Sequence, residues 1–415
     1  MSTLAHRIAP LATALSLLLS LVAAPAEALP ERDPPENPFV TYEHPQDWTM
    51  RVNLRVRAWQ ETRSNTIRTD NWEFATVAVI YPLMTDTASA RLDPETVAGT
   101  LKFDDRTVAS SFTAIDGYHS NQRYAKFEAV GVYGREMQLE VEALTRAWRT
   151  QFDEAAASRV VWPEGPLPPD AQATLAPQPF VETAPGGLGD PSDVDKLLLT
   201  WTNGNHPRSV PPLQLAKWVA GRVVEHVQPQ SDGLNRGRRF LGFEGFQLQG
   251  APQTARSGRG SPFDAAALLA AVYRQAGLPA RIVIAYREVD DDDPDDDERG
   301  AGRLRAYVEF YLHDEANNRG GWIPVDVVAM RESSSRAPTD LSKPWRYFGT
   351  HDELDLYIPL SFNFHPPTTV RAYGSPAMWG WFVTPTPPSI AYQYLSFTAF
   401  RTPQRASGPV LPGER

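Results

Sequence analysis

The residues that could carry out chemistry in this chain of 415 amino acids do not include cysteine, because the sequence has none. A thiolate nucleophile and disulfide bonds are therefore both excluded. Ser261 and Asp326 offer a hydroxyl and a carboxylate, and Arg305 offers a guanidinium that stays protonated at physiological pH. A serine needs an adjacent, oriented base before it can act as a nucleophile, so Ser261 alone is a weak candidate.

Metal binding has one candidate region, an acidic run from Asp290 to Glu298. Clustered carboxylates are the usual ligands of calcium in exported proteins. The candidate ligands are Asp291, Asp293, Asp295 and Asp297. The run lacks the glycine and the distant glutamate of an EF-hand, so a solvated, self-repelling loop is the favoured interpretation. The histidines lack metal-ligand spacing, and we expect no other cofactor.

The segment Ser261–Gly277 has the signals of a well-defined helix. Ser261 suits the N-cap, Pro262 suits the first turn, and Asp264 completes a capping box, while Gly277 ends the helix. The residues from 265 to 271 are almost all small or apolar. A helix that is apolar on most of its surface must be buried, so we expect it at the centre of its domain.

The patterns around this helix predict an α+β core that follows an all-β sandwich. Three strands are expected after the helix, at 281–286, 306–312 and 322–328. Before it, from about residue 48 to 150, apolar and polar residues alternate with the period of a strand. The clearest runs are Met50, Val52, Leu54 and Val56, and Met137, Leu139 and Val141. Several such strands separated by turn residues indicate a small sandwich.

The order of these patterns divides the chain into four parts. The N-terminus has the layout of a secretory signal peptide, since Arg7 precedes an apolar run that ends at the small-residue site Ala26–Ala28. A stretch rich in proline separates the sandwich from the core. The expected parts are a signal peptide at 1–28, the sandwich at 35–160, a linker at 161–191, and the core with a C-terminal extension at 192–405.

Charge and hydropathy restrict the partners and the location. The net charge is −10, and no basic stripe with interleaved aromatic residues occurs, so nucleic-acid binding is not expected. The longest uncharged stretch after the leader, residues 372–400, is interrupted by prolines and cannot be a spanning helix. We expect an exported protein, in the periplasm, at the cell surface or outside the cell, without a mature transmembrane segment.

Several segments beyond residue 191 form a recognisable set. Gly258–Ala266, Tyr273–Arg274 and Gly277–Arg281 together resemble the central helix of the bacterial transglutaminase-like superfamily, which has a papain-like fold. Arg305–Glu309 resembles the strand that carries the family's histidine, and Gly321–Asp326 resembles the strand that carries its aspartate. The resemblance implies a papain-like core, and the sandwich before it is consistent with an accessory domain of such proteins.

The catalytic positions implied by this resemblance are mostly not retained. Counted back from Arg274 and Gly277, the family's nucleophilic cysteine falls on Pro262, and its histidine falls on Arg305. Only the aspartate, Asp326, is kept. Proline has no nucleophilic group, and arginine cannot accept a proton as the base would have to. The resemblance therefore implies the fold, whereas the residues argue against the activity.

Two of these residues leave alternatives open. Arg305 is expected to form an ion pair with Asp326, or else to bind an acidic group of a ligand in the former cleft. Ser261 is expected to be an N-cap, or else a displaced nucleophile one residue before the lost cysteine. The candidates for contacts in the cleft are Arg305, Glu309 and Asp326.

The hypothesis that follows is an exported, catalytically inactive transglutaminase-like protein. Its former active-site cleft would bind a peptide, a cell-envelope component or a protein partner. The alternative is an active amide hydrolase or transferase with a non-cysteine nucleophile such as Ser261. A third hypothesis is a calcium-stabilised surface protein, whose melting temperature calcium would raise and a chelator would lower.

Overall fold

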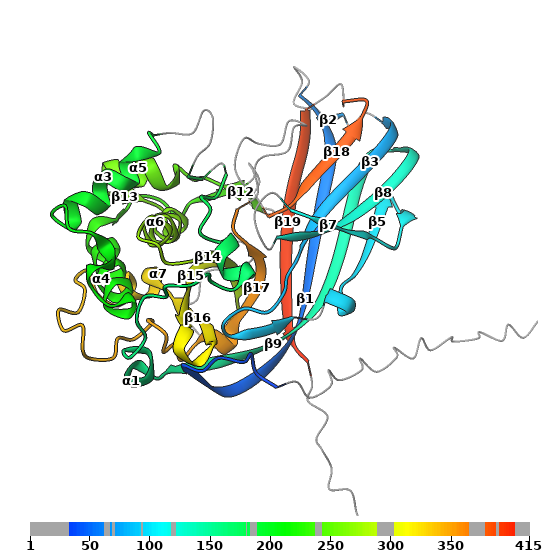
Figure 1. Cartoon of the computed structure of the whole chain (residues 1–415). Coiled ribbons are helices and arrows are strands. Elements are labelled where there is room, and N and C mark those ends of the chain that lie inside the picture. Colours follow the sequence, from blue (N-terminus) through cyan, green and yellow to red (C-terminus); the bar gives the residue numbers. More distant parts are fainter. Residues whose placement is uncertain are drawn as a thin grey trace, which may run out of the picture.

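The computed structural model describes residues 33–61, 67–68, 71–92, 94–117, 122–179, 181–182, 189–236, 243–288, 303–364, 378–386 and 390–402. The predicted signal peptide and the calcium candidates Asp291, Asp293, Asp295 and Asp297 lie outside these residues and stay predictions. Figure 1 shows a β-rich region beside a region of helices around a smaller sheet, so the fold is α+β as expected. Over the described ranges, no helix has the length and apolarity that a membrane span requires.

A β-sandwich forms the first region. Its strands are β1 (Val40–Glu61), β2 (Ile67–Arg68), β3 (Trp72–Leu83), β4 (Ala90–Leu92), β5 (Ala98–Phe103), β6 (Arg106–Ala109), β7 (Thr113–Asp116), β8 (Arg123–Gly134), β9 (Glu136–Phe152), β11 (Leu234–Arg236), β12 (Phe243–Phe246), β18 (Gly380–Thr384) and β19 (Ile390–Arg401). The larger sheet has the order β11-β12-β19-β1-β9-β5-β6, with β2 on β1 and β4 on β9. The smaller sheet has the order β18-β3-β8-β7.

The alternation of apolar residues explains why these strands bury one face. Val52 on β1 lies opposite Val141 on β9, and both are buried. Phe74 on β3 meets Phe103 on β5 across the interior, with 6.1 Å between the ring centroids. Because successive side chains of a strand point to opposite faces, this register places one apolar set inside the sandwich.

The C-terminal strands differ from the expected division, which assigned residues 192–405 to the core. Strand β19 pairs with β1 along its whole length, and β18 pairs with β3, so both complete the sandwich (Figure 1). The indole of Trp381 on β18 is buried and donates to the side-chain oxygen of Gln393 on β19 (2.7 Å). Without β19 and β18, the backbone N–H and C=O groups along one edge of β1 and of β3 would lack hydrogen-bond partners.

The core contains a four-stranded antiparallel sheet with the order β16-β15-β14-β17 and a set of helices. Its strands are β14 (Ala280–Arg287), β15 (Leu304–Asp314), β16 (Arg319–Val325) and β17 (Tyr357–Phe362), and the two-residue strands β10 (Gln228–Pro229) and β13 (Arg259–Gly260) pair in parallel. Its helices are α3 (Ser192–Trp201), α4 (Pro212–His226), α5 (Gly250–Ser257), α6 (Pro262–Gln275) and α7 (Val327–Ser333).

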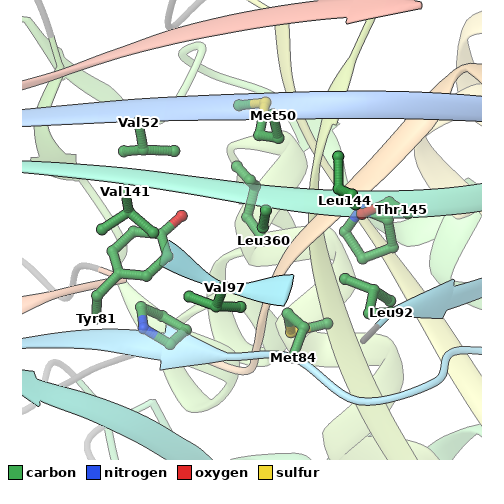
Figure 2. A pocket seen from close by; sticks show the side chains of 13 residues that line it. Met50, Val52, Tyr81, Met84, Leu92, Val97, Val141, Leu144, Thr145 and Leu360 are labelled. Atoms are coloured by element: carbon green, nitrogen blue, oxygen red, sulfur yellow. The ribbon is translucent and has the colours of Figure 1, made fainter. Parts of the chain in front are cut away.

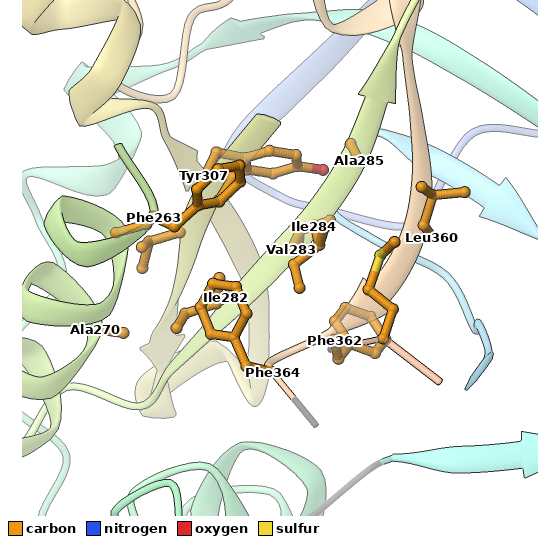
Figure 3. Packing of buried hydrophobic residues seen from close by; sticks show 14 of the residues in the cluster. Phe263, Ala270, Ile282, Val283, Ile284, Ala285, Tyr307, Leu360, Phe362 and Phe364 are labelled. Atoms are coloured by element: carbon orange, nitrogen blue, oxygen red, sulfur yellow. The ribbon is translucent and has the colours of Figure 1, made fainter. Parts of the chain in front are cut away.

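Helix α6 is the centre of this core, as its apolar sequence predicts. It packs against α3, α4, α5 and α7 and against the strands β14 and β15. Figure 3 shows part of the buried cluster, with Phe263 and Ala270 from α6, Ile282 from β14 and Tyr307 from β15. The third expected strand ends at Val325, three residues early, because Asp326 begins helix α7.

The proline-rich segment 161–191 was expected to be an extended linker, but its described part packs on the core. It follows the short helix α1 (Glu154–Ala157) and contains α2 (Pro169–Ala173). The buried guanidinium of Arg274 on α6 donates to the carbonyl of Thr174 (3.0 Å) and forms an ion pair with Glu182. A buried guanidinium without acceptors would be strongly destabilising, so these contacts hold the segment in place.

Polar and apolar contacts join the sandwich to the core. The indole N–H of Trp48 on β1 donates to the backbone carbonyl of Asp355 (2.7 Å), and Arg149 on β9 donates to the Asp355 carboxylate (3.0 Å). Beside them, Leu360 of β17 and Met50 of β1 line a space of only about 30 Å³ (Figure 2). Such a space holds little more than a water molecule, so the two regions are closely packed here.

Candidate functional site

The N-terminus of α6, where the nucleophile is expected, is closed by a hydrogen-bonded cap. The hydroxyl of Ser261 donates to Oδ2 of Asp264 (2.8 Å) and accepts the Asp264 backbone N–H (3.1 Å). The Ser261 backbone N–H donates to the same carboxylate (2.9 Å). The predicted capping box is thus confirmed, with Pro262 in the first turn. Ser261 is only 2% exposed, so its hydroxyl is bonded and not presented to a substrate.

Asp264 ties the start of α6 to the start of α5. Its Oδ1 accepts the backbone N–H groups of Gln249 (3.0 Å) and Gly250 (3.1 Å). Burial raises the pKa of the Asp264 carboxyl, although its hydrogen bonds act in the opposite direction. The carboxylate that contacts Ser261 therefore has a structural role in holding two helices together.

A cavity of about 300 Å³ lies beside Pro262. Helices α4, α6 and α7 and the strand pair β10–β13 contribute its walls. The apolar lining residues are Val223, Val224, Val227, Pro229, Pro262, Ala265, Val327 and Val328. The remaining lining residues are Ser231, Gly260, Ser261, Arg331 and Glu332. Mostly apolar walls with a few polar groups are typical of small-ligand pockets, which begin at about 300 Å³.

Asp326, which the resemblance places at the family's aspartate position, is buried and hydrogen-bonded through both carboxylate oxygens. Its Oδ1 accepts the backbone N–H groups of Val328 (3.1 Å) and Ala329 (2.9 Å) and so caps α7. Its Oδ2 accepts the hydroxyl of Tyr357 (3.3 Å) and lies 3.5 Å from Nε2 of His351. Burial, and then the nearby Asp326 carboxylate, raise the pKa of Tyr357.

His351 is a partner of Asp326 that the sequence analysis missed. Its Nδ1 accepts the backbone N–H of Glu353 (3.2 Å), so in the neutral ring Nε2 carries the proton and points it toward Asp326. The backbone of His351 exchanges hydrogen bonds with Thr150 on β9 (3.0 and 3.2 Å). No spacing or motif connects His351 with Asp326, because only the contact with the sandwich brings the segment into place.

Arg305 does not form the expected ion pair with Asp326. Within the described residues, the Asp326 carboxylate is occupied by the groups named above, and the Arg305 guanidinium donates to the carbonyl of Leu304 (3.0 Å). Arg305 is on the face of β15 opposite to Phe310, whose ring packs 5.5 Å from that of Tyr273 on α6. The alternation of the strand therefore directs Arg305 away from α6.

Glu309 shares the Arg305 face of β15 and is fully buried. Its carboxylate forms an ion pair with Arg281 (2.6 Å) and accepts the backbone N–H of Ala88 from the sandwich (2.7 Å). The Arg281 guanidinium lies 4.2 Å from the ring centroid of Trp322. Glu309 therefore links the two regions of the molecule.

The predicted site residues thus separate into two places. Pro262 and Ser261 line the cavity at α6, whereas Arg305, Glu309 and Asp326 are not among its lining residues. The structure brings Asp326 together with His351 and Tyr357, not with Arg305 or Pro262. This arrangement can bind an apolar group at α6. Among the described residues that line the cavity, the carboxylate of Glu332 is the only side chain that could act as a base.

A family model described as the transglutaminase-like superfamily matches residues 239–327. This segment runs from the approach to α5 through α6 to the start of α7, and it contains the cavity-lining Ser261 and Pro262 as well as Asp326. The core of the chain is therefore a transglutaminase-like domain, as the motifs predicted.

Comparisons with solved structures found distant matches. A solved structure from Cytophaga hutchinsonii, described as a cysteine protease, is 13% identical, with a TM-score of 0.49, and the alignment covers 88% of this chain and 94% of that one. The periplasmic domain of TgpA from Pseudomonas aeruginosa is 13% identical, with a TM-score of 0.27 and coverage of 72% and 93%. No curated protein matches the chain.

Proposed function

We propose that this protein is exported and that its transglutaminase-like core binds a partner and does not catalyse a reaction. The partner is a peptide, a cell-envelope component or another protein, and the cavity beside Pro262 is its binding site. One observation carries the proposal: where a nucleophile would stand, a proline ring borders an apolar space of about 300 Å³. Such a space favours binding by burial of apolar surface.

The surrounding groups support a non-catalytic core. Both ring nitrogens of His351 are in use, one toward Asp326 and one toward the Glu353 N–H, and the ring is buried. Arg305 cannot take a proton from a nucleophile. A nucleophile at the start of α6 would therefore lack the oriented imidazole that the family's chemistry requires.

An amide hydrolase or transferase with Ser261 as its nucleophile is the second candidate. The observation in its favour is the 2.8 Å hydrogen bond from the Ser261 hydroxyl to the Asp264 carboxylate. That hydroxyl is buried, however, and it already accepts the backbone N–H of Asp264. Attack on a substrate would require the cap of α6 to open, so we place this function second.

The export part of the proposal depends on the layout of residues 1–28. Expression of the full chain in a bacterial host, followed by fractionation and N-terminal sequencing, tests it. We expect the mature protein in the periplasm or medium with Leu29 as its first residue. A full-length protein that stays in the cytosol would contradict export.

The binding part is tested by a screen of the mature protein against short peptides, cell-wall fragments and envelope proteins. Ala265 lines the cavity and is half-buried, so Ala265→Phe fills the space. Ala155→Phe, on the exposed surface of α1, is the matched control. We expect Ala265→Phe to abolish binding and Ala155→Phe to leave it unchanged. Binding that survives Ala265→Phe but is lost in Arg305→Ala would move the site to the core sheet and contradict the proposal.

A further inference from the structure

The cavity beside Pro262 carries one feature that defines its ligand, the guanidinium of Arg331. We infer that the cavity takes the C-terminal end of a peptide, with an aliphatic side chain in the apolar part and the terminal carboxylate on Arg331. This inference rests on the proposed binding function and specifies the chemistry of the ligand.

Arg331 lines the cavity and is held in position by neutral oxygen atoms. Its Nη1 donates to the carbonyls of Val224 (2.6 Å) and Ser335 (3.2 Å), and its Nη2 donates to Oε1 of Gln228 (2.9 Å). Among the described residues, no carboxylate lies within ion-pair distance of this guanidinium. An arginine that is oriented but not neutralised is well suited to an incoming carboxylate.

The other charged groups near the cavity do not provide a binding site for a ligand carboxylate. The positive end of α6 is already compensated by Asp264, whose carboxylate accepts the Ser261 N–H. Glu332 also lines the cavity, but its carboxylate carries the same charge as the ligand's, and consecutive residues of a helix point about 100° apart. The anionic end of a ligand is therefore attracted specifically to Arg331.

The polar groups at the cavity favour a peptide over a fatty acid, which would share the carboxylate and the apolar chain. Ser231 is one of the lining residues, and its hydroxyl oxygen can accept a hydrogen bond. A peptide has backbone N–H groups that can donate to such an oxygen, whereas a fatty acid has none.

The size and the walls of the cavity define the side chain. A cavity of about 150 Å³ is enough for benzene, so about 300 Å³ accommodates one branched aliphatic residue together with its carboxylate. Val223 and Val224 of α4 and the following Val227 form one wall, and α7 adds Val327 and Val328. Aliphatic walls of this kind favour a C-terminal valine, leucine or isoleucine over a polar residue.

Calorimetric titration of the mature protein with acetyl-Ala-Ala-Leu as the free acid and as the C-terminal amide tests the inference. We expect the acid to bind roughly tenfold or more tightly than the amide, as the loss of a charge-assisted hydrogen bond implies. Arg331→Gln should remove this preference, and Arg331→Lys should retain part of it. Arg336→Gln, an exposed arginine five residues further on, is the charge-matched control and should keep the full preference.

The remaining outcomes separate this inference from the proposed function. Equal binding of acid and amide, both abolished by Ala265→Phe, would overturn the carboxylate assignment and leave the cavity as a binding site. Octanoate binding as tightly as the acid peptide would overturn the choice of a peptide. If Ala265→Phe leaves the binding of every ligand unchanged, both the carboxylate assignment and the proposed binding site are wrong. Thermal unfolding of each variant establishes that the protein is folded in every titration.

Discussion

The start of α6 and the sandwich-facing side of the core sheet both contain positions implied for catalysis, yet they differ in character. At α6, Ser261 and Asp264 bond to each other, and the neighbouring Pro262 borders an apolar cavity. On the sheet side, Glu309 of β15 and Asp326, which follows β16, are buried and bonded to polar partners. The comparison indicates that the buried carboxylates stabilise the fold, whereas Pro262 at the start of α6 borders an open space.

The physical reason lies in how each side chain tolerates burial. A carboxylate taken out of water must be paired or hydrogen-bonded, so Glu309 and Asp326 can persist only with partners such as Arg281, His351 and Tyr357. A proline in the first turn of a helix needs no partner, because that position has no intrahelical hydrogen bond to donate. Substitutions of Glu309 or Asp326 should therefore lower the free energy of unfolding more than substitutions of Ser261 or Pro262.

The largest effect is expected on the sheet side, from Glu309→Ala. The variant leaves the Arg281 guanidinium buried without its carboxylate, so the free energy of unfolding should fall by about 3–5 kcal/mol. Urea denaturation measures this loss. Glu140→Ala, which removes a partly exposed ion pair with Lys102, is the control and should cost no more than about 1 kcal/mol. Similar losses of unfolding free energy in Glu309→Ala and Glu140→Ala would show that the buried ion pair stabilises the fold no more than an exposed one.

Asp326→Ala should have the next largest effect, because it removes the cap of α7 and leaves His351 and Tyr357 without their shared acceptor. We expect a loss of about 2–3 kcal/mol in the free energy of unfolding. Asp153→Ala, which removes only the exposed N-cap of α1, should cost about 1 kcal/mol. A loss in Asp326→Ala no larger than this control would show that the buried contacts contribute nothing.

The raised pKa of Asp264 predicts a pH-dependent stability at α6. Between the unfolded pKa of about 3.9 and the higher folded value, the folded protein binds more protons than the unfolded chain. The contribution of this group is therefore complete below about pH 4 and is lost as pH rises through the folded pKa. Asp264→Asn does not titrate, so the stability of the wild type relative to this variant should decrease from pH 4 to pH 7. An increase over that range would contradict the assigned direction.

Ser261→Ala should have a smaller effect of about 1 kcal/mol, the usual loss for an N-cap hydroxyl. Amidase and cross-linking assays of the wild type and the variant complete the test. We expect no activity in either protein. Activity in the wild type that Ser261→Ala abolishes would establish the serine as a nucleophile and overturn the non-catalytic proposal.

Pro262→Cys should have the smallest effect. It restores a thiol at the family's position, but no base stands ready to deprotonate it, so transamidation should stay absent. The free energy of unfolding should change by no more than about 1 kcal/mol, because proline is favourable but not essential in the first turn of a helix. Strong transamidation by this single variant would show that a usable base lies beside α6.

Much of the local structure was determined by the sequence itself. The cap, the first turn and the burial of α6 depend on residues within one or two turns of each other, so Ser261, Pro262 and Asp264 predict them correctly. The alternation of Val52 and its neighbours likewise predicts which face of β1 is buried. These signals are short-range, and nothing distant in the chain has to be known to interpret them.

The arrangement of the site was decided only by tertiary structure. Three contacts join segments that are far apart in the sequence, and no local pattern predicts them. They are the pairing of β19 with β1, the contact of His351 with Asp326, and the buried ion pair of Arg281 with Glu309. The cavity at Pro262 exists because three separate segments of the core, at 223–231, 260–265 and 327–332, leave a space between them. The sequence shows that the chain has no cysteine, but only the packing of distant elements shows what surrounds Pro262.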